Sequence, residues 1–325
     1  MVVEGLLKQL TLGEGRKILG EIAQLQLPDD LLVWVKEYEK VGHRDRILWQ
    51  WMYKSVQIVT APVVDQQYLE RLYVLKTTVI IFVTLLDDVA DNMHDASFLR
   101  ELIKIPFQVN TLNRDQLSKE KLQYLSVVLN IWNYIDATLK TLPLYEQYRE
   151  IFQYDFDQLL NEMNYAILVH QYPFILNTTE FWEYIPYNMQ SFVSYDMDYM
   201  CATAFNTADL GCVRKVVYLL QRMAKIGNWL STWERELQED DITNIIFLYA
   251  VERDITDLEE LKSNKDAATQ KIKRGNLEKI LFDEWENAYN NIDEILSLHN
   301  VVDKGIVLKG AADFLLMHLS HRNYI

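Results

Sequence analysis

The amino-acid sequence predicts an all-α protein, and three observations support this prediction. Glycine, which supports the tight turns of sheet proteins, does not occur between Gly42 and Gly211. The six prolines fall at intervals along the chain, as breaks between helices do. Between them, stretches such as DRILWQWMYKSVQIV and EKLQYLSVVLNIWNYIDATLKTL carry apolar residues at three- and four-residue spacing. We expect about ten helices or more, with no repeat and no run of alternating strands.

Composition favours one globular domain over residues 1–325. Half of the 325 residues are apolar and 24% are charged, which is enough apolar material for a substantial core. No linker rich in proline, glycine and serine divides the chain. The formal net charge of −15 lacks the basic footprint that binding to phosphates of nucleic acid requires, so nucleic acid is excluded as a partner.

Several features indicate a cytoplasmic protein that has no membrane partner. The two cysteines, Cys201 and Cys212, are expected to be ordinary thiols in a reducing compartment. The N-terminal sequence MVVEGLLKQLTLGEGRK has no apolar core of the kind that a secretory signal needs. The longest apolar run, Thr77–Leu86, is too short to span a bilayer.

Two patterns that could be read as functional motifs are rejected. The segment Gly15–Gly20 is followed by Glu21, whereas a phosphate-binding loop requires lysine and then serine or threonine at this point. His318 and His321 lie one helical turn apart but match no zinc-binding pattern.

The first acidic cluster follows the most apolar stretch of the chain. The segment Thr77–Leu86 is apolar on every side, which indicates a helix in the protein interior. It ends in the first cluster, which consists of Asp87, Asp88 and Asp91. Buried carboxylates at the C-terminal end of a helix are costly unless a cation compensates them, and Mg²⁺ prefers such oxygen ligands. The alternative is a solvated helix end.

A second polar cluster lies far from the first in sequence. Asn228, Thr232 and Glu236 are spaced at i, i+4 and i+8, so a helix would present all three on one stripe. An amide oxygen, a hydroxyl and a carboxylate can bind one hard cation. The alternative is an exposed helix face with polar residues at helical spacing.

The sequences DDVAD and NWLSTWERE resemble the aspartate-rich and NSE metal motifs of class I terpene synthases, chiefly the microbial type. The resemblance implies a single-domain helical bundle around a central active-site cavity, in which the two motifs face each other. The first cluster would hold two Mg²⁺ ions and the second cluster a third, and the three ions together would bind the diphosphate of the substrate. Asp241 and Asn244 match the tail of the NSE motif, where Asp240 replaces a glycine that is usual in the family.

The resemblance also implies residues that contact the diphosphate. Arg235 matches the basic residue that precedes the glutamate of the NSE motif. Family members commonly carry an Arg-Tyr pair near the C-terminus, and here Arg322 and Tyr324 occur in that order with one residue between them. A mobile charged tail is the alternative for this segment.

One element of the family pattern is missing. Microbial members usually carry an arginine that senses the diphosphate after a tyrosine upstream of the NSE motif, but no arginine lies between Arg149 and Arg214. Either another cation, Arg214 or Arg222, takes this role, or ionisation is triggered differently.

The activity implied by the resemblance is Mg²⁺-dependent ionisation of a prenyl diphosphate. The carbocation would cyclise, rearrange or be quenched to a terpene hydrocarbon or alcohol, with release of diphosphate. Aromatic faces stabilise cations, and Phe82, one turn before Leu86, is the residue expected to line the cavity. The substrate stays open between linear farnesyl or geranylgeranyl diphosphate and a bicyclic diterpenyl diphosphate. The partner is accordingly an upstream prenyltransferase or a class II cyclase, and a homodimer is a further option.

Two other classes of protein compete with this interpretation. A chain-elongating prenyltransferase shares the fold and the first motif, but it carries a second aspartate-rich motif where this chain has Asn228, Thr232 and Glu236. A non-catalytic helical binding or scaffold protein derived from this fold would explain the missing sensor arginine. It would not explain why potential metal ligands are kept at both clusters.

Overall fold

The computed structural model describes residues 2–10, 12–115 and 117–322, with side chains at all of these positions except 9, 12, 91 and 92. The described residues form seventeen α-helices joined by short 3₁₀ and π turns, and they contain no strand, which confirms the prediction of an all-α protein. The chain divides into two compact units. Unit 1 comprises Met1–Glu21, Leu168–Phe192 and Asn206–Ile325, and unit 2 comprises Ile22–Ile167 and Val193–Phe205. The single domain over residues 1–325 stays a prediction.

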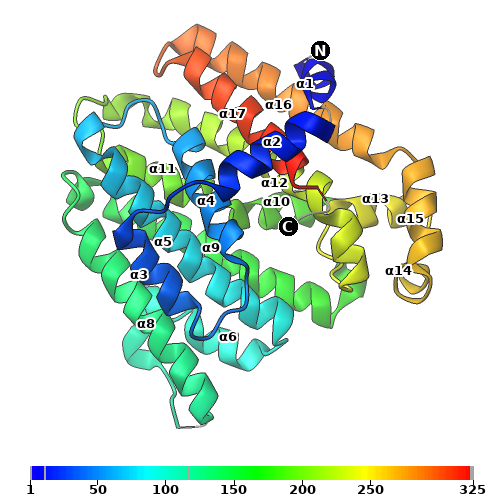
Figure 1. Cartoon of the computed structure of the whole chain (residues 1–325), viewed down its shortest axis with the longest axis horizontal. Coiled ribbons are helices and arrows are strands. Elements are labelled where there is room, and N and C mark those ends of the chain that lie inside the picture. The colour runs from blue at the N-terminus through cyan, green and yellow to red at the C-terminus, as the bar shows by residue number, and fades with distance from the viewer. Residues whose placement is uncertain (1, 11, 116, 323–325) are drawn as a thin grey trace. The chain divides into compact units, whose positions relative to one another are not determined.

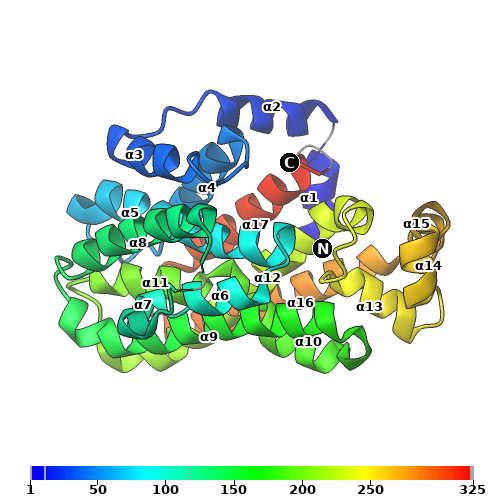
Figure 2. The same ribbon diagram turned by 90° about the horizontal axis from the view of Figure 1, so that it is seen from below.

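Unit 2 is built around a buried central helix, α5. Its helices are α3 (Asp29–Tyr38), α4 (Arg46–Val59), α5 (Leu69–Asp87), α6 (Ala96–Leu102), α7 (Ile105–Gln108) and α8 (Lys119–Leu139), with most of α9 (Tyr145–Gln171) and α11 (Ser191–Met200). Helix α5 contacts α3, α4 and α8, and these four helices are grouped together in Figure 2. It carries apolar residues around its whole circumference because it is enclosed in this way.

Unit 1 is organised by the long helix α12. Its helices are α1 (Val2–Gln9), most of α2 (Leu12–Ala23), α10 (Thr178–Tyr184), α12 (Leu210–Gln238), α13 (Ile245–Glu252), α14 (Leu258–Ser263), α15 (Lys265–Arg274), α16 (Leu277–His299) and α17 (Lys304–Ser320). Helix α12 contacts both α16 and α17, which also contact each other, and Figure 1 shows these two red and orange helices side by side. The buried residues of α12 are concentrated between Val213 and Leu237.

The prolines mark helix boundaries, as the sequence predicts. Each lies before a helix, in its first turn, in a 3₁₀ turn or between helices: Pro28, Pro62, Pro106, Pro143, Pro173 and Pro186. Short polar side chains complete several helix starts; for example, Asp45 accepts a hydrogen bond from the backbone N–H of Ile47 at 2.9 Å at the start of α4. None of the described helices is both long enough and apolar enough to cross a membrane.

Candidate functional site

The first cluster lies where α5 ends. Asp87 is the last residue of α5 and is partly exposed. The chain then continues as a π-helical turn, Asp88–Asn92, in which the N–H of Met93 donates to the carbonyl of Asp88 at 3.2 Å. Such π turns are rare and occur frequently at functional sites. Asp91 lies within this turn, and its side chain is outside the described side chains.

Both carboxylate oxygens of Asp88 accept hydrogen bonds from side chains of unit 2. Tyr38 Oη donates to Asp88 Oδ2 at 2.6 Å, and Arg44 Nε donates to Asp88 Oδ1 at 2.9 Å. Burial raises the pKa of the Tyr38 phenol, and its hydrogen bond to the carboxylate raises that pKa further. Burial alone would lower the pKa of Arg44, but the charge and the hydrogen bond of Asp88, with smaller contributions from Tyr38 and Asp87, together outweigh it, so the pKa of Arg44 is raised. Asp88 is therefore held by two donors at the end of an apolar helix.

A close approach at Gly42 positions Tyr38. A Cβ atom at Gly42 would lie 2.1 Å from Tyr38 Cζ, so only glycine allows the aromatic ring to occupy its position. The Tyr38 hydroxyl also accepts a hydrogen bond from the backbone N–H of Arg44 at 3.2 Å. Gly42, Tyr38 and Arg44 thus form one local arrangement that holds Asp88.

The second cluster lies on one helix, as its spacing predicts. Asn228, Thr232 and Glu236 are all residues of α12. Thr232 Oγ1 donates to the backbone carbonyl of Asn228 at 2.8 Å, which fixes the hydroxyl on the helix surface. Asn244, at the start of α13, donates from Nδ2 to Glu236 Oε2 at 2.7 Å and to the carbonyl of Trp229 at 3.1 Å. The tail of the motif therefore contacts the carboxylate of the cluster.

Glu236 has an unusual acidity. Burial is the largest cause that raises the pKa of its carboxyl to about 7, and repulsion from Asp241 adds to it. Lys225, Asn244 and Thr232 act in the opposite direction but do not compensate the burial fully. A carboxylate in this situation gains from a nearby cation. The amide, hydroxyl and carboxylate oxygens of the second cluster are ligands that suit Mg²⁺.

Among the described side chains, no three His, Cys, Asp or Glu residues gather as a metal site. The second cluster contains only one residue of these types, Glu236, and the first cluster depends on Asp91, whose side chain is not described. The metal ligands of both clusters therefore stay a prediction.

Sequence reasoning missed Lys225. Its side chain is buried, with 6% of the residue exposed, and Nζ donates to Asn228 Oδ1 at 3.2 Å. The ammonium also lies 5.5 Å from the centre of the Trp229 ring. The spacing of the sequence could have indicated this residue. Lys225 precedes Thr232 by seven residues and therefore lies on the same stripe of α12.

The three residues predicted to bind diphosphate differ in their surroundings. The buried Nε of Arg235 has no hydrogen-bond acceptor among the described residues, and Nη1 lies 3.8 Å from Glu239 Oε1. The Arg322 guanidinium donates to Glu278 and, at 2.9 Å, to Glu234 Oε1. Tyr324 lies outside the described residues.

The two arginines considered as replacements for the missing sensor stack on aromatic rings. The Arg222 guanidinium lies 4.2 Å from the centre of the Trp182 ring, and the Arg214 guanidinium lies 4.7 Å from that of Phe192. Arg222 Nη2 is also 3.9 Å from Glu284 Oε2. A role for either arginine in sensing diphosphate stays a prediction.

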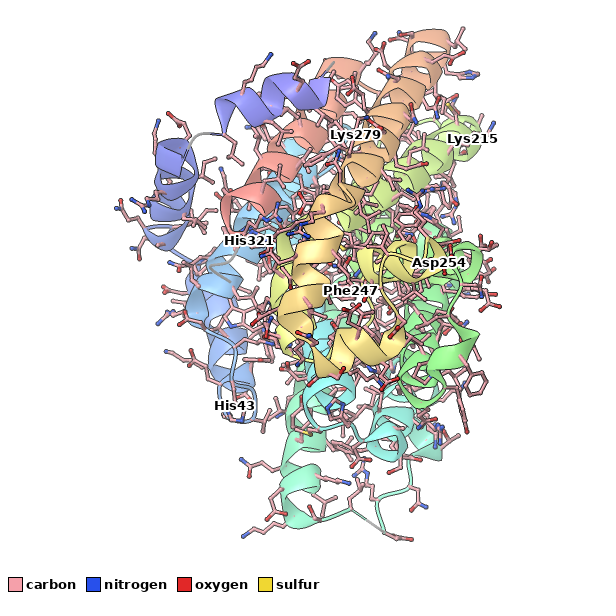
Figure 3. All side chains as sticks on the ribbon, turned by 90° about the vertical axis from the view of Figure 1, so that its right-hand side faces the viewer. His43, Lys215, Phe247, Asp254, Lys279 and His321 are labelled. Atoms are coloured by element: carbon pink, nitrogen blue, oxygen red, sulfur yellow. The ribbon has the colours of Figure 1, made fainter. Side chains whose placement is uncertain are left out.

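Two buried histidines at the end of α17 belong to the surroundings of the second cluster. Figure 3 labels His321 at the end of this helix, and the rings of His318 and His321 lie 5.6 Å apart. A Cβ atom at Gly227 would lie 2.9 Å from His318 Cδ2, so the ring packs against the backbone next to Asn228. Burial lowers the pKa of His318 well below its usual value and lowers that of His321 to about 4.

Phe82 is fully buried in an aromatic group of unit 2. The centre of its ring lies 5.0 Å from that of Trp132 and 6.1 Å from that of Phe156, and none of the side chain is exposed. A role for Phe82 in lining a cavity stays a prediction.

Comparisons with known proteins find similarity in structure and not in sequence. No protein-family model and no curated protein sequence matches the chain. The structure of linalool/nerolidol synthase from Streptomyces clavuligerus, in complex with 2-fluorogeranyl diphosphate, aligns over 91% of this chain and 98% of its own, with 12% identity and a TM-score of 0.52. Germacradien-4-ol synthase from Streptomyces citricolor aligns over 94% of this chain and 92% of its own, with 11% identity and a TM-score of 0.52. The chain has the class I terpene synthase fold.

Proposed function

We propose that this protein is a class I terpene synthase that ionises a prenyl diphosphate with the help of Mg²⁺. The carbon skeleton would then cyclise, rearrange or be quenched to a terpene hydrocarbon or alcohol, and inorganic diphosphate would be released. The fold supports this proposal but does not by itself select an activity, since one fold can carry several functions.

The single observation that carries the proposal is the arrangement of oxygen atoms along α12. Asn228, Thr232 and Glu236 present three different oxygen ligands from successive turns of one helix. Glu236 is held by Asn244, and burial raises the pKa of its carboxyl more than the neighbouring donors lower it. A structural helix face gains nothing from such a carboxylate, whereas a metal site uses it.

In the first cluster we assign different roles to the three aspartates. Both oxygens of Asp88 accept hydrogen bonds from protein donors, Tyr38 and Arg44, so Asp88 orients the end of α5. Asp87 and Asp91 are then the residues that would bind Mg²⁺ directly. This assignment narrows the sequence prediction, which gave all three aspartates as metal ligands.

The reaction needs positive charge around the leaving diphosphate. Bound Mg²⁺ would act as a Lewis acid that weakens the bond between carbon and the diphosphate oxygen. Arg235 would donate a hydrogen bond to the diphosphate, since its buried Nε has no acceptor among the residues that the structure describes. Arg322 would have to exchange its contacts with Glu234 and Glu278 before it could do the same.

The substrate proposed first is a linear prenyl diphosphate. The linalool/nerolidol synthase to which this chain is similar was solved with 2-fluorogeranyl diphosphate, a linear compound. Farnesyl and geranylgeranyl diphosphate are therefore the substrates to test before bicyclic diterpenyl diphosphates. A linear substrate requires an upstream prenyltransferase, and a bicyclic one requires a class II cyclase.

The test is an assay for product and for released diphosphate. The purified protein is incubated with Mg²⁺ and with each linear diphosphate and each bicyclic diterpenyl diphosphate, and the products are identified by gas chromatography and mass spectrometry. We expect one substrate to give a hydrocarbon or alcohol, and we expect Asn228→Ala to abolish turnover without loss of helicity. A folded protein that is inactive with every substrate would favour a scaffold protein, and a longer prenyl diphosphate as product would favour a prenyltransferase.

A further inference from the structure

Lys225 is a buried cation that belongs to no motif of the sequence. Only 6% of Lys225 is exposed, and no carboxylate of the described residues lies within 4.0 Å of its ammonium. The groups nearest to it are the amide oxygen of Asn228, at 3.2 Å, and the face of the Trp229 ring, and the charge of Glu236 acts on it from farther away. Buried charges are usually paired directly with an opposite charge, so two neutral contacts and a more distant carboxylate compensate the ammonium only in part.

The position of Lys225 on α12 relates it to the second cluster. It precedes Asn228 by three residues, Thr232 by seven and Glu236 by eleven, and all four positions fall on one stripe of a helix. Its hydrogen bond goes to the side-chain oxygen of Asn228, which is the atom that a metal ion would bind. The ammonium and a Mg²⁺ ion therefore compete for the same oxygen atom.

A Mg²⁺ ion bound to Asn228 would repel the ammonium of Lys225. Mg²⁺ binds oxygen at about 2.0–2.1 Å. An ammonium that stayed 3.2 Å from the same oxygen would then face a divalent cation at close range in a partly buried site. The ammonium must leave Asn228 when Mg²⁺ binds, and an anion near the metal is the group that best receives it.

Resting on the proposed function, we propose that Lys225 is a diphosphate-binding residue whose ammonium is held at Asn228 Oδ1 until Mg²⁺ takes that oxygen. Metal binding then directs the lysine to the diphosphate oxygens. The protein thereby has a cation in place of the missing sensor arginine. Arg214 and Arg222 serve this purpose less well because both stack on aromatic rings.

The test compares Lys225→Met with Lys215→Met, a control that removes an exposed lysine from the same helix. Mg²⁺ binding is measured by calorimetry first without any diphosphate and then with inorganic diphosphate. Without diphosphate, Lys225→Met should bind Mg²⁺ about tenfold more tightly than wild type, because the competing cation is gone. With Mg²⁺ in excess, the same variant should bind inorganic diphosphate about tenfold more weakly, because one charged donor is lost. Lys215→Met should match wild type in both measurements.

The outcomes separate this inference from the proposed function. If Lys225→Met equals wild type in either measurement while Asn228→Ala still loses Mg²⁺, the role of Lys225 is wrong and the metal site stands. If wild type binds no Mg²⁺, or if Asn228→Ala binds it as wild type does, both proposals fail. Lys225→Gln, which keeps a polar end group, replaces the methionine variant if the latter does not fold.

Discussion

Replacing Tyr38 with phenylalanine tests whether the end of α5 is held by the contacts of Asp88. The substitution keeps the ring, whose centre lies 4.7 Å from that of Trp49, and removes only the hydroxyl. A hydrogen bond to a charged carboxylate stabilises a protein by about 1.5–3 kcal/mol, and the neutral bond from the Arg44 N–H by about 0.5–1.5 kcal/mol. Both hydrogen bonds involve Tyr38 Oη, at 2.6 Å and 3.2 Å, so Tyr38→Phe should lower the free energy of unfolding by about 2–4.5 kcal/mol.

The assay is urea unfolding followed by circular dichroism, with Tyr134→Phe as the matched control. The ring of Tyr134 packs against Trp34 in the same unit, with ring centres 4.5 Å apart, and its hydroxyl makes no hydrogen bond among the described residues. The control should change the free energy of unfolding by less than about 0.5 kcal/mol. An equal effect of the two substitutions would refute the view that the Tyr38 hydroxyl holds Asp88. Tyr38→Phe should also weaken Mg²⁺ binding, since the first cluster would lose its fixed orientation.

Three further predictions concern the surroundings of the second cluster. Asp240 has a φ of 62°, which costs a non-glycine residue about 1–2 kcal/mol, whereas its exposed ion pair with Lys265, at 2.7 Å, contributes about 0–1 kcal/mol. Asp240→Gly should therefore raise the free energy of unfolding by about 1 kcal/mol, and a loss of stability would contradict this. The pKa of His321 falls from 6.5 to about 4 on folding, so its contribution to stability is complete above pH 6.5 and is lost as the pH falls toward 4. This loss amounts to roughly 3 kcal/mol in urea unfolding, and His321→Gln should show a flatter dependence on pH. Gly227→Ala should cost about 1–3 kcal/mol because its Cβ would meet His318, whereas Gly20→Ala, with open space around it, should be neutral or stabilising; equal effects would contradict the close packing.

The helices that carry both clusters could be predicted from the sequence. An apolar run as continuous as Thr77–Leu86 has few alternatives to a buried helix, and α5 buries most of its residues in the protein. The spacing of Asn228, Thr232 and Glu236 likewise predicts one helical stripe, and all three lie on α12. In both cases the signal is local, because helical periodicity depends only on neighbouring residues.

The contacts that orient the clusters could not be predicted in this way. Tyr38 and Asp88 are 50 residues apart, and only the folded backbone brings them together. The need for glycine at position 42 depends on the same contact, since its reason is the ring of Tyr38 and not a turn. Local propensity also gives no sign that the helix changes to a π turn at Asp88. At Asp240 the sequence shows the departure and the structure explains it. The left-handed backbone of this residue gives a physical reason for the glycine that class I terpene synthases usually carry at this place in the motif.

The most direct test of the central claim is the number of divalent ions that each chain binds in the presence of inorganic diphosphate. Mn²⁺ in place of Mg²⁺ allows the bound ions to be counted by electron paramagnetic resonance. The proposed function predicts three ions for wild type, two for Asn228→Ala, which loses the ion of the second cluster, and one for Asp87→Ala, which loses those of the first. The same number of bound ions in all three proteins would contradict the claim that these two clusters are metal sites.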